Sequence, residues 1–135
     1  MDLLTGSNII LTLKITVAAV TCLFLASLVA LLRGNYRLHG WINTVFMVLT
    51  LTALLGLEVV ARLLRPGVFE EHFNQTGAWT ALYVHLCFSL PAAVVLVAMF
   101  LTGRAHRATL HVTLGVLFAV LWTGTFITGI FFLPH

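Results

Sequence analysis

Residues 8–32 read NIILTLKITVAAVTCLFLASLVALL, an almost unbroken apolar run whose one charged residue is Lys14. About 20 such residues in an α-helix cross the hydrocarbon core of a bilayer, so this run predicts a membrane-spanning helix. Three further runs of the same kind follow at residues 40–64, 78–102 and 110–133. Short connections place consecutive helices antiparallel to one another. The sequence therefore predicts an all-α fold, a four-helix transmembrane up-down bundle that forms a single domain over residues 1–135.

The composition supports this fold and excludes several functions. Of the 135 residues, 61% are hydrophobic and only 8% are charged, too few to give a water-soluble globule its polar surface. The four runs leave no room for a catalytic domain outside the membrane, and no serine or cysteine nucleophile shares a predicted level with a base. We therefore expect an accessory or electron-transfer protein rather than an enzyme. We expect its partners to be the lipid bilayer and a larger respiratory membrane complex, and no nucleic acid.

The arginines predict the orientation of the chain in the membrane. The first connection (33–39) and the third (103–109) carry four arginines and no acidic residue, namely Arg33, Arg37, Arg104 and Arg107. The second connection offsets its arginine with Glu70 and Glu71. Since cytoplasmic loops are enriched in arginine and lysine, the first and third connections are predicted to be cytoplasmic and both termini to lie outside.

Three ionisable residues lie several residues inside the predicted spans and need an explanation, Lys14, Glu58 and His85. Each costs at least about 2.5 kcal/mol to insert, so each needs a partner or a function. With the termini outside, all three lie at one depth near the outer face. One interpretation is a structural ion pair of Lys14 with Glu58, with His85 hydrogen-bonded beside it and Thr125 or Thr128 completing the polar layer. The other is a proton path or a cofactor site.

Three histidines are predicted at the opposite, cytoplasmic face. His39 opens the second span, and His106 and His111 flank the start of the fourth. A histidine with a small residue one turn further on, as in His111 and Gly115, suits a b-type haem, because the imidazole binds iron and the missing side chain leaves space for the macrocycle. A haem between His39 and His111 is one interpretation; copper bound by the same imidazoles is another. Ordinary interfacial histidines, with glycines that serve helix packing, are the third.

Helical periodicity places these residues on stripes that face the bundle interior. The stripe of the second span holds His39, Asn43, Thr50 and Glu58. The stripe of the third span holds Ala81, His85, Ser89, Ala92 and Gly103. The stripe of the fourth span holds His111, Gly115, Phe118, Trp122, Thr125 and Gly129. A second histidine site near the outer face, formed by His85 with His72 or His135, is also compatible with this pattern.

Several short segments give the chain a resemblance to a known family. They are Tyr36-Arg37-Leu38-His39, Tyr83-Val84-His85-Leu86 with Pro91 further on, His106-Arg107, and Thr125-Phe126-Ile127-Thr128-Gly129. With the four-helix layout they resemble the YozB/CtaM-type family of small bacterial membrane proteins. The resemblance implies a bacterial inner membrane and a role as accessory subunit or biogenesis factor of a haem-copper terminal oxidase. It also implies that His39, His85 and His106 or His111 bind metal or haem.

One departure from this family concerns the outer end of the second span. The family carries a further histidine there, whereas the nearest polar residue of this chain is Glu58. A second resemblance, carried by His111 and Gly115 and by histidines at helix ends, is to cytochrome b561-like four-helix haem proteins, and it implies a haem b that carries electrons from quinol. A purely structural membrane subunit is the remaining alternative.

Overall fold

The computed structural model describes residues 4–135, and these residues are helical almost throughout. The elements are α1 (Gly6–Leu32), α2 (Tyr36–Val59), the π-helix η1 (Val60–Leu64), α3 (Val68–Thr76), α4 (Trp79–Arg104), α5 (Ala108–Ile127) and the π-helix η2 (Thr128–Phe132). Four helical stretches are long and apolar enough to cross a membrane: Gly6–Leu32, Tyr36–Leu64, Trp79–Arg104 and Ala108–Phe132. The predicted all-α fold with four spans is thus confirmed, and residues 4–135 contain no strand.

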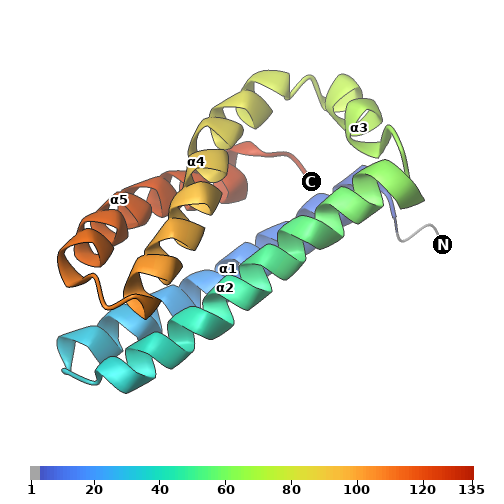
Figure 1. Cartoon of the computed structure of the whole chain (residues 1–135). Helices are drawn as coiled ribbons and strands as arrows, with labels where there is room; N and C mark the ends of the chain where they lie inside the picture. Colours follow the sequence, from blue (N-terminus) through green and yellow to red (C-terminus); the bar gives the residue numbers. More distant parts are fainter. Residues whose placement is uncertain (1–3) are drawn as a thin grey trace.

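The four long helices form two antiparallel hairpins, α1 with α2 and α4 with α5 (Figure 1). Side chains begin α1 and α2, because the Thr5 hydroxyl accepts a hydrogen bond from the Asn8 N–H at 3.3 Å and the Asn35 carbonyl oxygen accepts one from the Leu38 N–H at 3.1 Å. At the turn between α4 and α5, His106 has a φ of 55°, a left-handed conformation that is uncommon outside glycine. These short turns bring the first and third connections to one end of the molecule.

The short helix α3 was not expected, since residues 65–77 were interpreted as a connection only. Gly67 and Gly77 stand on either side of it with φ values of 82° and 66°. Its first turn carries Glu70 and Glu71, where a carboxylate is favoured by the helix dipole. Val68, His72 and Phe73 are buried, and α3 packs against α1. The signal was present in the sequence, as a glycine at each end of an amphipathic segment.

The two hairpins meet in an apolar core. Its buried members are Val20, Phe46, Ala92, Leu96, Met99, Phe118 and Trp122. The rings of Phe118 and Trp122 stack with centroids 5.6 Å apart, and the ring of Phe46 meets Trp122 edge-on at 5.0 Å. This aromatic cluster joins α2 to α5 near the middle of the bundle.

Burial confirms most of the predicted interior stripes. On α5, Phe118, Trp122 and Thr125 are buried and His111 and Gly115 are half-buried, and Gly129 of η2 is buried as well. The stripe of α4 is likewise buried or half-buried. On α2, the prediction holds for His39, Asn43 and Thr50 but is wrong for Glu58, whose side chain is 59% exposed. The C-terminal part of α2 therefore does not pack as tightly into the bundle as expected.

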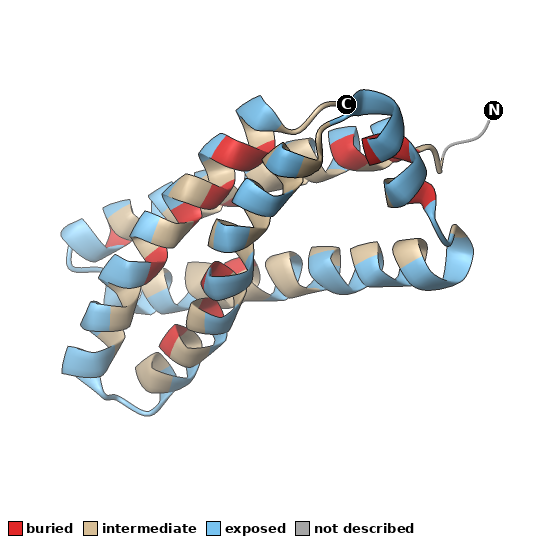
Figure 2. Ribbon diagram, turned by 90° about the horizontal axis from the view of Figure 1, so that it is seen from above, coloured by how far each residue is buried: buried red, intermediate tan, exposed pale blue. Residues whose placement is uncertain are grey.

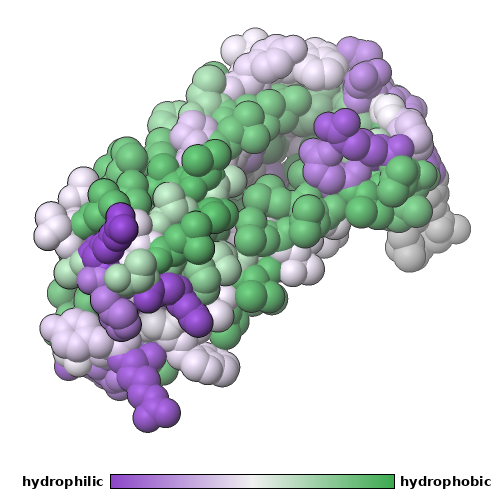
Figure 3. Space-filling view, in the orientation of Figure 1, coloured by the Kyte–Doolittle hydropathy of each residue, from purple (hydrophilic) through white to green (hydrophobic). Residues whose placement is uncertain are grey.

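The outer surface of the helices is apolar. Figure 2 shows that buried residues line the facing sides of the helices, while the outward sides are exposed. Those exposed sides carry large aliphatic residues, such as Ile15, Leu55 and Val94, each more than 60% exposed. In the space-filling view, hydrophobic atoms cover the middle of the molecule and hydrophilic ones gather towards its ends (Figure 3). This is the surface of an integral membrane protein, for which lipid is the solvent.

Candidate functional site

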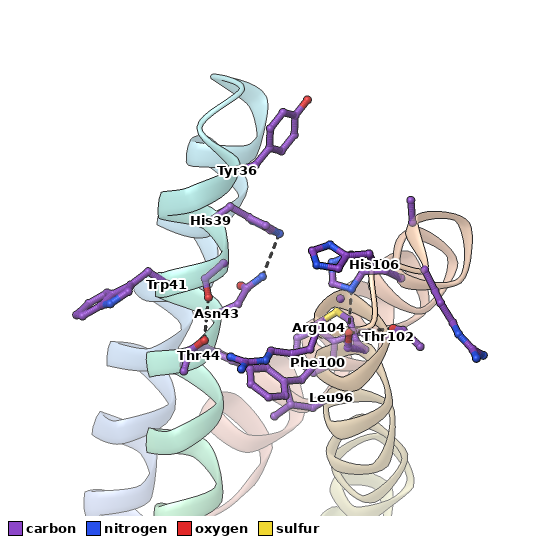
Figure 4. Close-up of a pocket in the computed structure, with 18 of the residues that line it drawn as sticks. Tyr36, His39, Trp41, Asn43, Thr44, Leu96, Phe100, Thr102, Arg104 and His106 are labelled. Atoms are coloured by element: carbon purple, nitrogen blue, oxygen red, sulfur yellow. Dashed lines mark hydrogen bonds between the residues drawn. The ribbon is translucent and has the colours of Figure 1, made fainter.

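A cavity of about 760 Å³ lies between the two hairpins, at the end that carries the first and third connections. Its walls include the histidines that the sequence placed at this face, His39, His106 and His111. Side chains from α2 and α4 approach it from opposite sides, as the close-up in Figure 4 shows for Asn43, Thr102 and the residues around them. The volume falls in the range of cavities that hold small molecules and cofactors.

Two kinds of side chain surround these imidazoles. The apolar part of the wall is aromatic, with Phe24, Phe46, Phe100 and Phe118. The polar part carries three arginines, Arg37, Arg104 and Arg107, the first from α2 and the others from the end of α4 and the turn after it. An apolar interior beside several guanidinium groups suits a flat, mostly apolar molecule that carries carboxylates.

A hydrogen-bond network fixes the imidazole of His39. Its Nδ1 lies 3.0 Å from the carbonyl oxygen of Ser27, which can only accept, so Nδ1 carries the proton. Its Nε2 accepts from the Asn43 amide at 3.0 Å, and the Asn43 carbonyl oxygen accepts from the Ser27 hydroxyl at 2.6 Å. Ser27 is buried. The network holds the ring in one orientation, with the lone pair of Nε2 pointing away from α1.

The imidazole of His111 is fixed in a similar way by α4. Its Nδ1 donates to the carbonyl oxygen of Met99 at 2.8 Å, which leaves Nε2 as an acceptor or a metal ligand. A Cβ at Gly103 would lie 2.9 Å from Nδ1 and Cε1 of this ring, so the missing side chain of Gly103 makes the close contact of α4 and α5 possible. A backbone carbonyl that holds one imidazole nitrogen is the usual support for a metal-binding histidine.

Gly115 was predicted to leave space for a macrocycle beside His111, but in the structure it lies away from the cavity. A Cβ at Gly115 would meet only the sulfur of Met99, at 3.7 Å, and Gly115 does not line the cavity. The glycine that accommodates His111 is Gly103, on the neighbouring helix. Helical periodicity placed Gly103 on the interior stripe but could not pair it with His111, because that pairing is a contact between α4 and α5.

The rings of His39 and His111 face each other with centroids 6.4 Å apart and planes at 82°. Metal–imidazole nitrogen bonds of about 2.0–2.1 Å put the ring centres of two imidazoles on opposite sides of one metal roughly 6 to 6.5 Å apart. The separation of the two rings therefore fits a group held between two imidazoles, although Nε2 of His39 is directed at the Asn43 amide in this structure. His106 is an exposed residue at the rim of the same cavity, with no role in fixing either ring.

The polar layer near the other end is arranged differently from the predicted ion pair. Lys14 donates to the carbonyl oxygen of Ile130 at 2.9 Å, and its Nζ lies 3.3 Å from Nδ1 of His135. Glu58 forms its ion pair with Arg62, one turn further along the same helix. The predicted pairing of Lys14 with Glu58 is therefore wrong. The carbonyl of Ile130 lies in the final helical turn, where no intrahelical N–H remains to satisfy it.

The other histidines have separate partners. His85 forms a hydrogen bond with the Thr128 hydroxyl of η2 at 3.0 Å, and not with the predicted pair of Lys14 and Glu58, while Thr125 bonds within its own helix. His72 is buried against Gly6 and lies 3.3 Å from the carbonyl oxygen of Pro134. Over residues 4–135, no group of three or more histidine, cysteine or acidic side chains is placed to hold a metal ion.

No protein family model, no curated protein and no solved structure matches this chain.

Proposed function

We propose that this chain is a respiratory-membrane protein that binds one haem b between His39 and His111. It acts as an electron-transfer or accessory subunit beside a terminal oxidase. The observation that carries the proposal is the pair of facing imidazoles, 6.4 Å apart, each with its Nδ1 anchored on a backbone carbonyl. Membrane haem proteins use this kind of ligand set, two histidines from different helices of a bundle.

The surroundings of the pair support haem over a bare metal ion. Aromatic rings of Phe24, Phe46 and Phe118 give the macrocycle an apolar wall, and Arg37, Arg104 and Arg107 give its carboxylates cationic partners. A bound haem would supply one-electron chemistry, and His39 and His111 would hold and orient it. The Asn43 amide, now on Nε2 of His39, would have to release that nitrogen.

A copper site is the second candidate, and Met99 favours it. Met99 lines the cavity together with both histidines, and two imidazoles with a thioether are suitable ligands for Cu(I). A copper-binding chain would act as a biogenesis factor for the oxidase, as the family resemblance implies. His85 lies outside this cavity and is assigned to neither site.

The arginines that line the cavity also support the proposed orientation. Arg37, Arg104 and Arg107 gather at one end of the bundle, whereas Glu70 and Glu71 lie in α3 at the other. We therefore place the cavity at the cytoplasmic face of a bacterial inner membrane, with both termini outside.

The test is the absorption spectrum of the protein after gentle detergent extraction, with metal analysis of the same sample. A reducible Soret band and α band at one haem per chain support the haem proposal. Copper without haem supports the biogenesis role. A protein that contains neither, also after addition of haem or of Cu(I), overturns both and leaves a structural subunit.

A further inference from the structure

The second membrane span is covered by the rest of the chain less than the other three. Phe46 is the only buried residue of α2, whereas α1, α4 and α5 each bury at least three residues. No residue of η1, which continues α2 to Leu64, is buried. α2 lies along one edge of the molecule with α1 beside it (Figure 1). The outward side of α2 is therefore open to another molecule in the membrane.

This outward side carries a sequence repeat of seven residues. Two series make up the repeat: Trp41, Val48, Leu55 and Arg62, and Thr44, Leu51 and Glu58. We call these residues together the outer stripe. The three apolar members of the first series are 70%, 53% and 67% exposed, and the side chain of its arginine is 77% exposed. Two positions that each recur every seven residues, three or four residues apart, are the pattern with which helices pack side by side in a left-handed coiled coil.

The outer stripe differs from the outward faces of the other spans because it contains an ion pair, Glu58 with Arg62. Glu58 lies six residues before the end of the span at Leu64, and its side chain is 59% exposed. Ionised groups that face lipid are costly, and those within spans are usually directed at protein. The outward faces around Val94 of α4 and Val120 of α5 are exposed and carry no ion pair in residues 4–135. The charges therefore indicate α2 as the face that meets protein.

The rest of the chain offers Glu58 no second cation. Glu58 lines a second cavity, of about 550 Å³ between the hairpins, whose wall contains no lysine or arginine. Lys14, which the sequence predicted as its partner, is bonded to the Ile130 carbonyl oxygen instead. A carboxylate and a guanidinium can each accept or donate more hydrogen bonds than one partner uses. A neighbour that carries both charges at this depth would complete the pair on both sides.

A second copy of the chain has both charges at the required depth. Copies of one chain insert in the same orientation, so two α2 helices that meet are parallel, and a two-fold axis along the membrane normal places identical residues at identical depth. In a parallel coiled coil, a side chain of one series inserts between residues of the partner helix that include the other series one turn earlier. Arg62 of one copy then contacts Glu58 of the other, and this contact occurs twice.

We propose that two copies of the chain form a parallel dimer through the outer stripe of α2, with Arg62 of each copy paired to Glu58 of the other. The apolar members of the stripe, Trp41, Val48, Leu51 and Leu55, form the rest of the interface. The dimer goes beyond the proposed function and needs neither haem nor copper, because His39 and His111 do not belong to the outer stripe.

The first experiment is disulfide cross-linking in the membranes of cells that make the full chain. Cys22 and Cys87 are replaced by serine, and Val48→Cys is oxidised with copper phenanthroline. A covalent dimer of twice the chain mass is expected, because identical residues of the stripe face each other across the axis. Val94→Cys is the matched control: it is the same substitution near the middle of another span, and Val94 is 71% exposed.

The second experiment tests the pairing of charges between copies. Glu58→Arg and Arg62→Glu each place like charges across the interface, so each is expected to weaken the dimer at least about 10-fold in liposomes, measured by energy transfer between labelled copies. Copies with Glu58→Arg and copies with Arg62→Glu, carrying different tags and produced together, are expected to purify as a mixed dimer. Within each such copy the two residues repel, so only pairing between copies restores the contact. The double variant Glu58→Arg/Arg62→Glu in one chain should dimerise like the unaltered protein.

Several outcomes would overturn the dimer. Equal cross-linking of Val48→Cys and Val94→Cys, or none of either, would mean that lipid covers the outer stripe. A cross-link of Val48→Cys to a different protein would mean that another subunit occupies the stripe. A mixed dimer that forms no better than the dimers of either variant alone would contradict the pairing of Arg62 with Glu58 between copies. A failed cross-link leaves the haem spectrum unchanged, and a protein without haem can still cross-link, so the two proposals fail separately.

Discussion

The imidazole of His111 is held by a main-chain atom of another helix, the carbonyl oxygen of Met99, at 2.8 Å. This contact links α5 to α4 beside the cavity and determines which nitrogen of His111 is available to a ligand. A side chain in that place could rotate, but a helical carbonyl is fixed. The orientation of the candidate ligand therefore depends on how closely the two helices approach, and the residue that permits the approach is Gly103.

Gly103→Ala is expected to disturb the site. Its Cβ would lie 2.9 Å from two ring atoms of His111, so the ring or the helix must move, at a cost of about 1–3 kcal/mol in the free energy of unfolding. The haem content of the purified Gly103→Ala variant is expected to fall, because the imidazole of His111 is displaced. Gly115→Ala is the matched control, since its Cβ meets only the Met99 sulfur at 3.7 Å. If Gly115→Ala lost haem and Gly103→Ala kept it, the glycine that makes room for the cofactor would be Gly115, one turn after His111 on α5, and not Gly103 on α4.

Single replacement of either facing histidine is expected to remove the cofactor. His39→Ala and His111→Ala each remove one of the two imidazoles that would hold the haem, so the Soret band of purified protein should be lost or change in position. His106→Ala is the control, because His106 is exposed and holds neither ring. Unchanged spectra in both His39→Ala and His111→Ala would remove this pair from the site.

Ser27→Ala is expected to weaken cofactor binding without removing a ligand. The Ser27 hydroxyl donates to Asn43 and lies 2.8 Å from Nδ1 of His39, so its loss leaves Nδ1 held by the Ser27 carbonyl oxygen alone and the imidazole less firmly oriented. Losses of such supporting groups reduce metal affinity by about 10- to 100-fold, measurable as haem transfer to an apoprotein acceptor. Thr113→Ala, which removes an exposed hydroxyl bonded only to its own helix, should change nothing. Equal transfer rates in both variants would show that the network does not position His39.

The fold could be predicted from the sequence because hydrophobic length is decisive in a membrane. The predicted limits 8–32 and 78–102 differ from those of α1 and α4 by at most two residues at each end. The periodicity of 3.6 residues also placed Phe118, Trp122 and Thr125 on the buried face of α5. Both signals are local, and neither needs knowledge of how the hairpins pack.

The partners within the site could not be predicted in the same way, since they depend on contacts between helices. His39 and His111 were paired from their common depth, but Ser27 and Met99 contribute through a buried hydroxyl and a carbonyl that carry no sequence signal for this role. Common depth also suggested Lys14 with Glu58, and there it failed. The position of a residue along a span predicts its depth in the membrane, but it does not predict which neighbouring helix its side chain faces.

Lys14 and Glu58 are expected to act independently. Because Lys14 bonds to the Ile130 carbonyl and Glu58 to Arg62, Lys14→Met and Glu58→Gln should change the free energy of unfolding additively, within about 0.3–0.5 kcal/mol. Unfolding in mixed micelles of the two single variants and the double variant measures the coupling. A coupling above about 1 kcal/mol would restore the ion pair that the structure lacks.

The orientation in the membrane can be tested with cysteines at the two ends of the bundle. The exposed thiols of Cys22 and Cys87 are first replaced by serine. In intact cells, a membrane-impermeant maleimide should then label Gln75→Cys, on α3, but not Ala105→Cys, in the connection that leads to α5. The arginines beside Ala105 provide the reason, since positive loops stay in the cytoplasm. After lysis both variants should react, which is the control. Labelling of Ala105→Cys alone in intact cells would show the opposite orientation and place the first cavity at the outer face.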